Sequence, residues 1–150
     1  MEQNAISQLE KELVKILREE YTFYQSLYVL LDKQKDIIKY NKDENLLDIY
    51  AEVERCHKRI QQSEEKITFI KNKNPKLFRL ASISPNVRKL VKSITTLVKK
   101  CMSVVQDNEA YVNAKHTRIK EELGELKNSE KILNYISSDT KSPQFIDGKG

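Results

Sequence analysis

Residues that interrupt helices are scarce in this chain, which has only three glycines and three prolines among 150 residues. Tryptophan is absent and aromatic residues make up 7% of the sequence, whereas charged residues make up 33%. This composition is typical of long helices and not of mixed sheets. Because the length lies within the usual range of one domain, we expect a single all-α domain.

Cysteines and long hydrophobic runs are also few. Cys56 and Cys101 are the two cysteines, and each is expected to lie among apolar neighbours on a helix. A disulfide framework needs more cysteines at shorter range. The N-terminal sequence MEQNAISQLEKELVK lacks the basic start and apolar segment of a signal peptide. No uncharged apolar run approaches the length of about 18 residues that suggests a transmembrane helix. We therefore expect a cytoplasmic protein that is not inserted in a membrane.

Residues suited to metal binding or catalysis do not form recognisable sets. Neither CxxC nor HxxxH occurs, and the adjacent Cys56 and His57 would point about 100° apart on a helix. His116 lies in a polar stretch, where we expect a solvated side chain. No glycine-rich phosphate loop or nucleophile elbow is present. Carboxylate pairs stand among lysines and arginines, which a solvated helix face explains: Glu19 with Glu20, and Glu64 with Glu65. We therefore expect no enzyme, no metal site and no cofactor.

Apolar residues recur every three or four positions over most of the chain, the pattern of helices that each bury one face. The pattern predicts helices over about residues 6–40, 44–72 and 85–137 within one domain at 1–138. The short connection makes the first two helices antiparallel. The predicted fold is an elongated antiparallel helical hairpin plus a long third helix, in a three-helix bundle or coiled coil.

Polar and helix-breaking residues mark the predicted helix ends. Asp43 is expected to cap the second helix, and Pro75 cannot continue it. Ser84 and Pro85 form a strong start for the third helix, because the hydroxyl can accept from a free amide and proline has no amide to satisfy. Between these points we expect a bend whose apolar residues close one end of the hairpin: Leu77, Phe78, Leu80 and Ile83.

The third predicted helix has a weak middle. From Asn113 to Arg118 no large apolar residue occurs, and the stripe resumes at Ile119 with a shifted phase. Gly124 lowers helix stability there by about 1 kcal/mol. After Ile136 the sequence is polar and contains proline and glycine, so residues 139–150 are expected to form a flexible tail.

An aromatic cluster in the first predicted helix widens its apolar arc. It consists of Tyr21, Phe23, Tyr24 and Tyr28. An ordinary helical core is the favoured interpretation. The alternative is the lip of a groove that receives an amphipathic helix of a partner.

The net charge of +5 is concentrated in the middle of the chain. No acidic residue occurs between Glu65 and Asp107, whereas ten lysines and arginines fall there. A nucleic-acid backbone could be the partner, but no aromatic platform accompanies the basic residues. A solvated face or an acidic protein partner is therefore favoured over nucleic acid.

Several features together resemble the FlgN-like family of flagellar export chaperones. The helical hairpin has the turn Tyr40-Asn41-Lys42-Asp43-Glu44-Asn45-Leu46, Asn108 looks like an internal asparagine of the family's long third helix, and the chain ends Ser142-Pro143-Gln144-Phe145-Ile146-Asp147-Gly148-Lys149-Gly150. In the family's aromatic-Asp-x-Gly tail, Phe145 stands where tyrosine is usual.

The resemblance implies a cytoplasmic chaperone of the flagellar type III secretion system. Such a chaperone would bind the amphipathic terminal helices of hook-filament junction proteins, prevent their premature association and deliver them to the export apparatus. The part of the third helix after Tyr111 is the expected receiver, with an exposed apolar face from Ile119 to Ile136. The candidate cargo-binding residues are Tyr111, Val112, Ile119, Leu123, Leu126, Ile132, Leu133 and Ile136. The candidate residues for docking to the export apparatus are Phe145, Asp147 and Gly148.

A structural protein is the alternative. Exposed apolar stripes on long helices can also pair with themselves, which would give a homo-oligomeric coiled-coil scaffold or spacer without chaperone activity.

Overall fold

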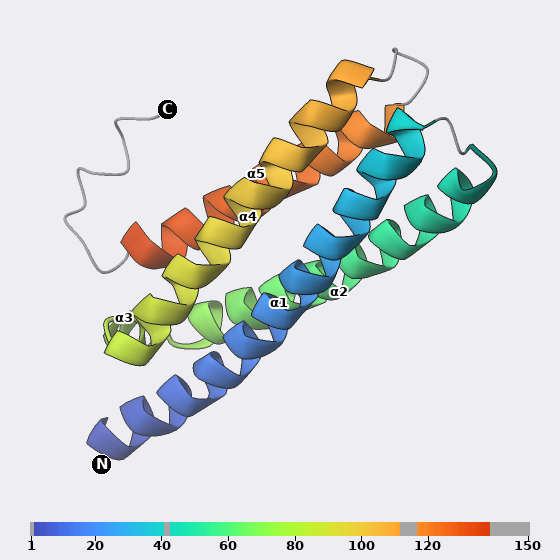
Figure 1. Ribbon diagram of the computed structural model, residues 1–150. Helices are drawn as coiled ribbons and strands as arrows, with labels where there is room; N and C mark the ends of the chain where they lie inside the picture. Colours follow the sequence, from blue (N-terminus) through green and yellow to red (C-terminus); the bar gives the residue numbers. More distant parts are fainter. Residues whose placement is uncertain (1, 41–42, 112–116, 139–150) are drawn as a thin grey trace.

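The computed structural model describes residues 2–40, 43–111 and 117–138, and the side chains among them except those of residues 43, 111, 117–120 and 138. Every regular element in these ranges is helical (Figure 1). The elements are α1 (Glu2–Lys39), the short 3-10 turn η1 (Asp43–Asn45), α2 (Leu46–Lys73), α3 (Pro75–Ser82), α4 (Pro85–Tyr111) and α5 (Thr117–Ser138). The predicted all-α class is confirmed.

Four long helices lie side by side; each runs opposite to the long helix before it in the chain, so that the neighbours α1 and α4 are parallel (Figure 1). α1 and α2 form an antiparallel hairpin, and α4 lies against the other side of α1. α5 runs back along α4 and contacts α2 much less extensively than it contacts α4. The short α3 joins α2 to α4 and packs mainly against α1. The seam between α2 and α5 is therefore the lightest contact among the neighbouring long helices.

The predicted third helix over residues 85–137 is wrong, because the structure has two helices there. α4 ends at Tyr111, and α5 begins at Thr117 and packs against α4. α4 and α5 run in opposite directions on either side of the lapse in the apolar stripe (Figure 1), so residues 85–137 do not form one helix. The bundle accordingly has four long helices where three are expected.

The connection between α2 and α4 also differs from the prediction, since the expected bend contains the helix α3. The side-chain oxygen of Asn74 accepts a hydrogen bond from the backbone N–H of Leu77 at 3.2 Å, and Pro75 occupies the first turn. Phe78 is fully buried and closes the end of the bundle, whereas Ile83 is 44% exposed and does not. Asp43 is not the cap of α2, which begins at Leu46 after Asn45.

The predicted start of α4 is confirmed. The hydroxyl of Ser84 accepts a hydrogen bond from the backbone N–H of Val87 at 3.2 Å, and Pro85 is the first residue of the helix. This bond satisfies one of the amides that a helix start leaves without a partner.

Replacing Ser84 with alanine is therefore expected to lower the free energy of unfolding by about 1 kcal/mol, the usual contribution of a cap. Urea titration followed by circular dichroism measures this change. Ser103, which is exposed on the same helix and has no capping position, provides the matched alanine control. Equal losses in the two variants would contradict the capping role.

The core is continuous along the four long helices. Tyr24 is fully buried, and Tyr21, Phe23 and Tyr28 are half-buried against the core. The favoured interpretation of the aromatic cluster as core is thus confirmed. Cys56 and Cys101 are buried free thiols, as predicted, and burial raises the pKa of Cys101 to about 12. Of the helices described, none combines the length and the apolar character needed to cross a membrane.

Candidate functional site

The predicted cargo-binding residues of α5 face the inside of the bundle. Leu126, Leu133 and Ile136 are 0%, 1% and 2% exposed, and Leu123 and Ile132 are half-buried against the core. The expected exposed apolar face from Ile119 to Ile136 is therefore wrong for the side chains described. The reason is that α5 runs back along α4, which places its apolar side chains in the core of the bundle.

The other candidate residues are placed only in part. Tyr111 is the last residue of α4 and Ile119 lies in the first turn of α5, but their side chains are not among those described. Val112 and the three candidate docking residues lie outside the described residues, as does the expected tail at 139–150.

Polar residues interrupt the buried stripe of α5. The buried positions of this helix recur every three or four residues, at Glu122, Leu126, Ser129, Leu133 and Ile136. Two of the five are polar, so α5 contributes less apolar surface than its length allows. A helix held by fewer apolar contacts separates from its neighbours at lower free-energy cost.

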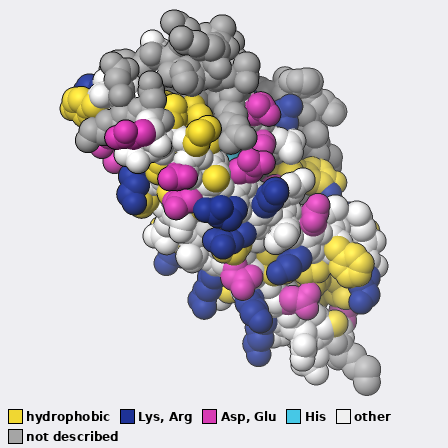
Figure 2. Space-filling model, turned by 90° about the vertical axis from the view of Figure 1, so that its right-hand side faces the viewer, with side chains coloured by type: hydrophobic (Ala, Val, Ile, Leu, Met, Phe, Trp, Pro, Cys, Tyr) yellow, Lys and Arg dark blue, Asp and Glu magenta, His cyan; other side chains and the backbone are white. Residues whose placement is uncertain are grey.

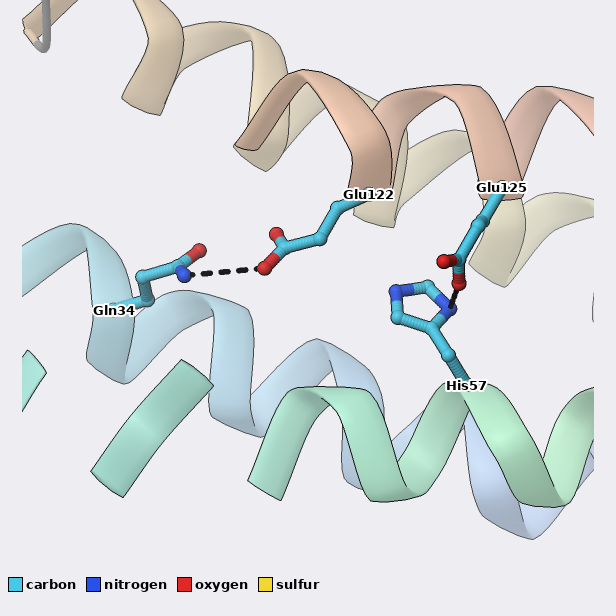
Figure 3. A network of polar contacts seen from close by, with 4 residues as sticks. All are labelled: Gln34, His57, Glu122 and Glu125. Atoms are coloured by element: carbon cyan, nitrogen blue, oxygen red, sulfur yellow. Dashed lines mark hydrogen bonds and ion pairs between the residues drawn. The ribbon is translucent and has the colours of Figure 1, made fainter. Parts of the chain in front are cut away.

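The first polar position lies in a network that joins three helices. The side-chain amide N–H of Gln34 on α1 donates to Glu122 on α5 at 3.4 Å, and that of Asn108 on α4 donates to Gln34 at 3.4 Å. All three residues are buried, and both bonds are at the long end of the range for hydrogen bonds. Figure 3 shows the amide of Gln34 directed toward the carboxylate of Glu122. Bonds of this length recover only part of the cost of burying these groups.

The second polar position, Ser129 of α5, belongs to a group of buried polar side chains that we call the carboxyl cluster; its other members are Glu20 and Tyr24 of α1 and Glu64 of α2. Glu20 is fully buried, and neither of its carboxyl oxygens has a hydrogen-bond partner among the residues described. The hydroxyl of Tyr24 is also buried and makes no hydrogen bond of good geometry among the residues described, although it interacts with the side chain of Ser129. The predicted solvated faces at Glu20 and Glu64 are therefore wrong, because both residues lie inside the bundle.

Burial changes the acidity of this cluster. It raises the pKa of Glu20 well above its ordinary value, and the charge of Glu64 raises it further. Burial raises the pKa of Glu64 to about 7. Burial, followed by the charges of Glu64 and Glu20, also raises the pKa of Tyr24. Near neutral pH Glu20 therefore favours its protonated form, Glu64 is present in both forms, and ionising both carboxyl groups inside the bundle is costly.

His57 joins α2 to α5 at the same seam. Its Nδ1 lies 3.0 Å from a carboxylate oxygen of Glu125, and the His57 side chain is 9% exposed while that of Glu125 is 55% exposed (Figure 3). Burial lowers the pKa of His57 to about 4. Because water screens the exposed carboxylate, it does not offset this burial. The contact at neutral pH is therefore a hydrogen bond donated by a neutral imidazole.

Two hollows on either side of His57 show that the seam is incompletely filled. Their volumes are about 230 Å³ and 150 Å³. The first is lined by Tyr50, Val53, Glu54, His57, Glu121, Glu122 and Glu125, and the second by His57, Ile60, Gln61, Glu64, Glu125, Asn128 and Ser129. Polar contacts and unfilled space along the same seam indicate that α2 and α5 pack weakly against each other.

The acidic residues of the seam do not make a metal centre. In the part of the chain that the structure describes, no group of three or more histidine, cysteine, aspartate or glutamate side chains has a geometry that could hold a metal ion.

The buried polar residues of α1 appear in the sequence as gaps in its apolar stripe. Glu20 stands between Leu17 and Tyr24, and Gln34 stands between Leu31 and Ile38, each at a three- or four-residue step. A search for apolar residues alone passes over such positions. Their spacing is the signal that would have placed them inside the bundle.

Comparison with known proteins does not extend this description, since no family model, no curated protein and no solved structure matches the chain.

Proposed function

We propose that the chain is an FlgN-like flagellar export chaperone of the cytoplasm, which binds amphipathic terminal helices of hook-filament junction proteins and delivers them to the export apparatus. The observation that carries the proposal is the seam between α2 and α5, where buried apolar side chains alternate with poorly satisfied polar ones. We also propose that the protein has no enzymatic activity.

The cargo-binding surface in this proposal is the buried face of α5. Because α5 packs chiefly on α4, it can stay attached to α4 while the seam with α2 opens. Opening exposes Leu126, Leu133 and Ile136 of α5, together with the apolar side chains of α1 and α2 that they cover. An amphipathic cargo helix that enters the seam buries both surfaces again.

The carboxyl cluster lowers the cost of this opening. When α5 moves away, water reaches Glu20, Glu64 and Tyr24, which have too few hydrogen-bond partners in the closed bundle. The hydration of these groups offsets part of the loss of apolar contact. The apparent affinity for cargo then depends on the fraction of molecules in the open state.

A distance measurement tests this proposal. Cysteines introduced in place of the exposed Lys58 of α2 and Lys127 of α5 can carry a pair of labels, after alanine replaces the two native cysteines. A synthetic peptide of a junction protein's terminal helix is expected to bind and to increase the distance between these labels. A peptide of the same composition, with its apolar residues scattered around the helix, is expected not to bind.

A second label pair, at Lys33 of α1 and Lys99 of α4, provides the control for opening at one seam. Its distance is expected to stay unchanged when the peptide binds. Absence of binding would contradict the chaperone function, and binding without a change between α2 and α5 would contradict the opening of the seam. A stable oligomer that binds no peptide would instead support the coiled-coil scaffold.

A further inference from the structure

The solvent face of α4 carries a row of basic side chains that we call the α4 stripe: Arg88, Lys89, Lys92, Lys99 and Lys100. All five are exposed, and no acidic residue occurs on α4 before Asp107. At 3.6 residues per turn, the five lie within about 120° of the helix circumference, and they span about 18 Å of its length. The stripe therefore forms one straight band of positive charge.

The α4 stripe has no counter-charge in the described part of the molecule. Among the residues described, none of its five side chains forms an ion pair with a carboxylate. Like charges at this spacing repel one another and destabilise the helix slightly. A partner with negative charge would relieve this repulsion.

Other faces of the molecule are different. Figure 2 shows a face on which basic and acidic side chains are intermingled and hydrophobic side chains reach the surface in separate patches. Exposed residues of α2 alternate in the same way, with Glu52 and Glu54 beside Arg55 and Lys58. These mixed surfaces of a second copy of this chain would therefore be a poor complement to the stripe.

The shape of the stripe also decides between classes of partner. A helix in the major groove of DNA is surrounded by the groove walls, but the flanks of α4 are covered by α1 and α5. The residues between the basic side chains include exposed Thr96 and Ser103 and no exposed aromatic residue, so bases have no stacking surface. An anionic membrane would require exposed apolar side chains beside the charges, and the stripe has none.

We propose that the α4 stripe is a docking surface for an acidic α-helix of a partner protein. The basic residues Arg88, Lys92 and Lys99 follow a spacing of four and seven residues. Carboxylates at the same spacing on a helix that lies alongside α4 meet these three side chains in turn. This surface is separate from the seam of α5, and the inference does not depend on the chaperone function.

A designed peptide tests the inference. The probe is a helical peptide with glutamates repeated at the spacing of Arg88, Lys92 and Lys99, and its control has the same composition with the glutamates distributed around the helix. Binding to the wild-type protein is measured by fluorescence anisotropy at low and at physiological salt. We expect the patterned peptide to bind more tightly than the control peptide, with weaker binding at higher salt.

Charge reversal locates the site. The triple variant Arg88→Glu, Lys92→Glu, Lys99→Glu is expected to weaken binding of the patterned peptide about tenfold or more, because three attractive charge pairs become repulsive. The matched variant Lys33→Glu, Lys58→Glu, Arg59→Glu changes the net charge equally at exposed positions of α1 and α2. It is expected to bind within about twofold of the wild type. Circular dichroism verifies that both variants are folded.

Three results would overturn the inference. Equal weakening in the two triple variants would show that only net charge matters. Equal binding of the two peptides would show that the spacing of the stripe is not recognised. Tighter binding to duplex DNA or to anionic phospholipid vesicles than to the patterned peptide would assign the stripe to a different class of partner.

Discussion

Replacing Glu20 with leucine is expected to raise the free energy of unfolding by about 1–3 kcal/mol near neutral pH, the cost that mutational data give for burying a polar group without a hydrogen-bond partner. Glu20 is fully buried, and both of its carboxyl oxygens lack a hydrogen-bond partner among the residues described. Leucine of similar volume keeps the contacts with the core and removes the cost of burying a carboxyl group. Chemical denaturation measures the change.

The neighbouring Glu19 provides the matched control, because it is exposed on the same turn of α1. Glu19→Leu is expected to change stability by less than about 0.5 kcal/mol. A loss of stability in Glu20→Leu would show that the carboxyl group has a stabilising partner in solution. If the seam of α5 opens for cargo, the stabilised variant should also bind cargo peptide more weakly. The affinity should fall about tenfold for each 1.4 kcal/mol by which the substitution stabilises the closed bundle over the open one.

The pH dependence of stability provides a further test of the carboxyl cluster. Because the pKa of Glu64 rises from 4.5 to about 7 on folding, the folded chain binds more protons than the unfolded chain between these values. This group therefore stabilises the fold below about pH 4.5, and its contribution falls by about 3 kcal/mol as the pH rises through 7. Glu64→Gln is expected to remove this fall.

His57 has the opposite effect, so the comparison must be made as a difference between variants. Its pKa falls from 6.5 to about 4 on folding, and stability is therefore lost as the pH decreases between these values. In the wild type, Glu64 and His57 change the stability in opposite directions with pH, and the two effects partly cancel between about pH 4.5 and 6.5. Subtracting the stability curve of Glu64→Gln from that of the wild type removes the histidine contribution and leaves that of Glu64 together with its effect on the pKa of Glu20. A difference that is flat with pH would contradict the raised pKa.

The hairpin and the start of α4 could be predicted from the sequence because local chemistry decides them. The apolar steps of α1 continue without interruption by proline or glycine, and Ser84 with Pro85 specifies a helix start on its own. α3 was missed because an eight-residue helix gives little periodicity, although Asn74 and Pro75 are a cap and a first turn.

The reversal between α4 and α5 could not be derived in this way. A polar stretch such as residues 113–118 suits a solvated part of a helix and a connection equally well, and the choice depends on what the following apolar residues can bury against. The neighbouring helices also decide which residues of α5 are buried. Leu123 and Ile132 look like stripe residues, but the buried positions include the polar Glu122 and Ser129, whose burial only the neighbouring helices explain.

Replacing Leu133 with aspartate is expected to separate α5 from the rest of the bundle. The leucine is 1% exposed on the face that α5 turns toward the core. Burying an aspartate there, with the loss of the leucine contacts, costs about 4 kcal/mol or more. This exceeds what a helix with two polar positions in its buried stripe can recover, whereas α1 retains its contacts with α2 and α4. Hydrogen exchange should therefore become fast in α5 and stay slow in α1.

Lys131→Asp, at an exposed position one half-turn away, provides the control and should leave exchange in α5 unchanged. Loss of protection throughout α1, α2 and α4 in Leu133→Asp would show that α5 is not a separable element, and cargo entry at its seam would then be contradicted. If α5 alone is released, the remaining helices expose the apolar side chains that it covers, and the variant should self-associate at high concentration. A cargo peptide that prevents this association would bind those exposed side chains without help from Leu133. A peptide that leaves the association unchanged would show that cargo binding needs the apolar face of α5.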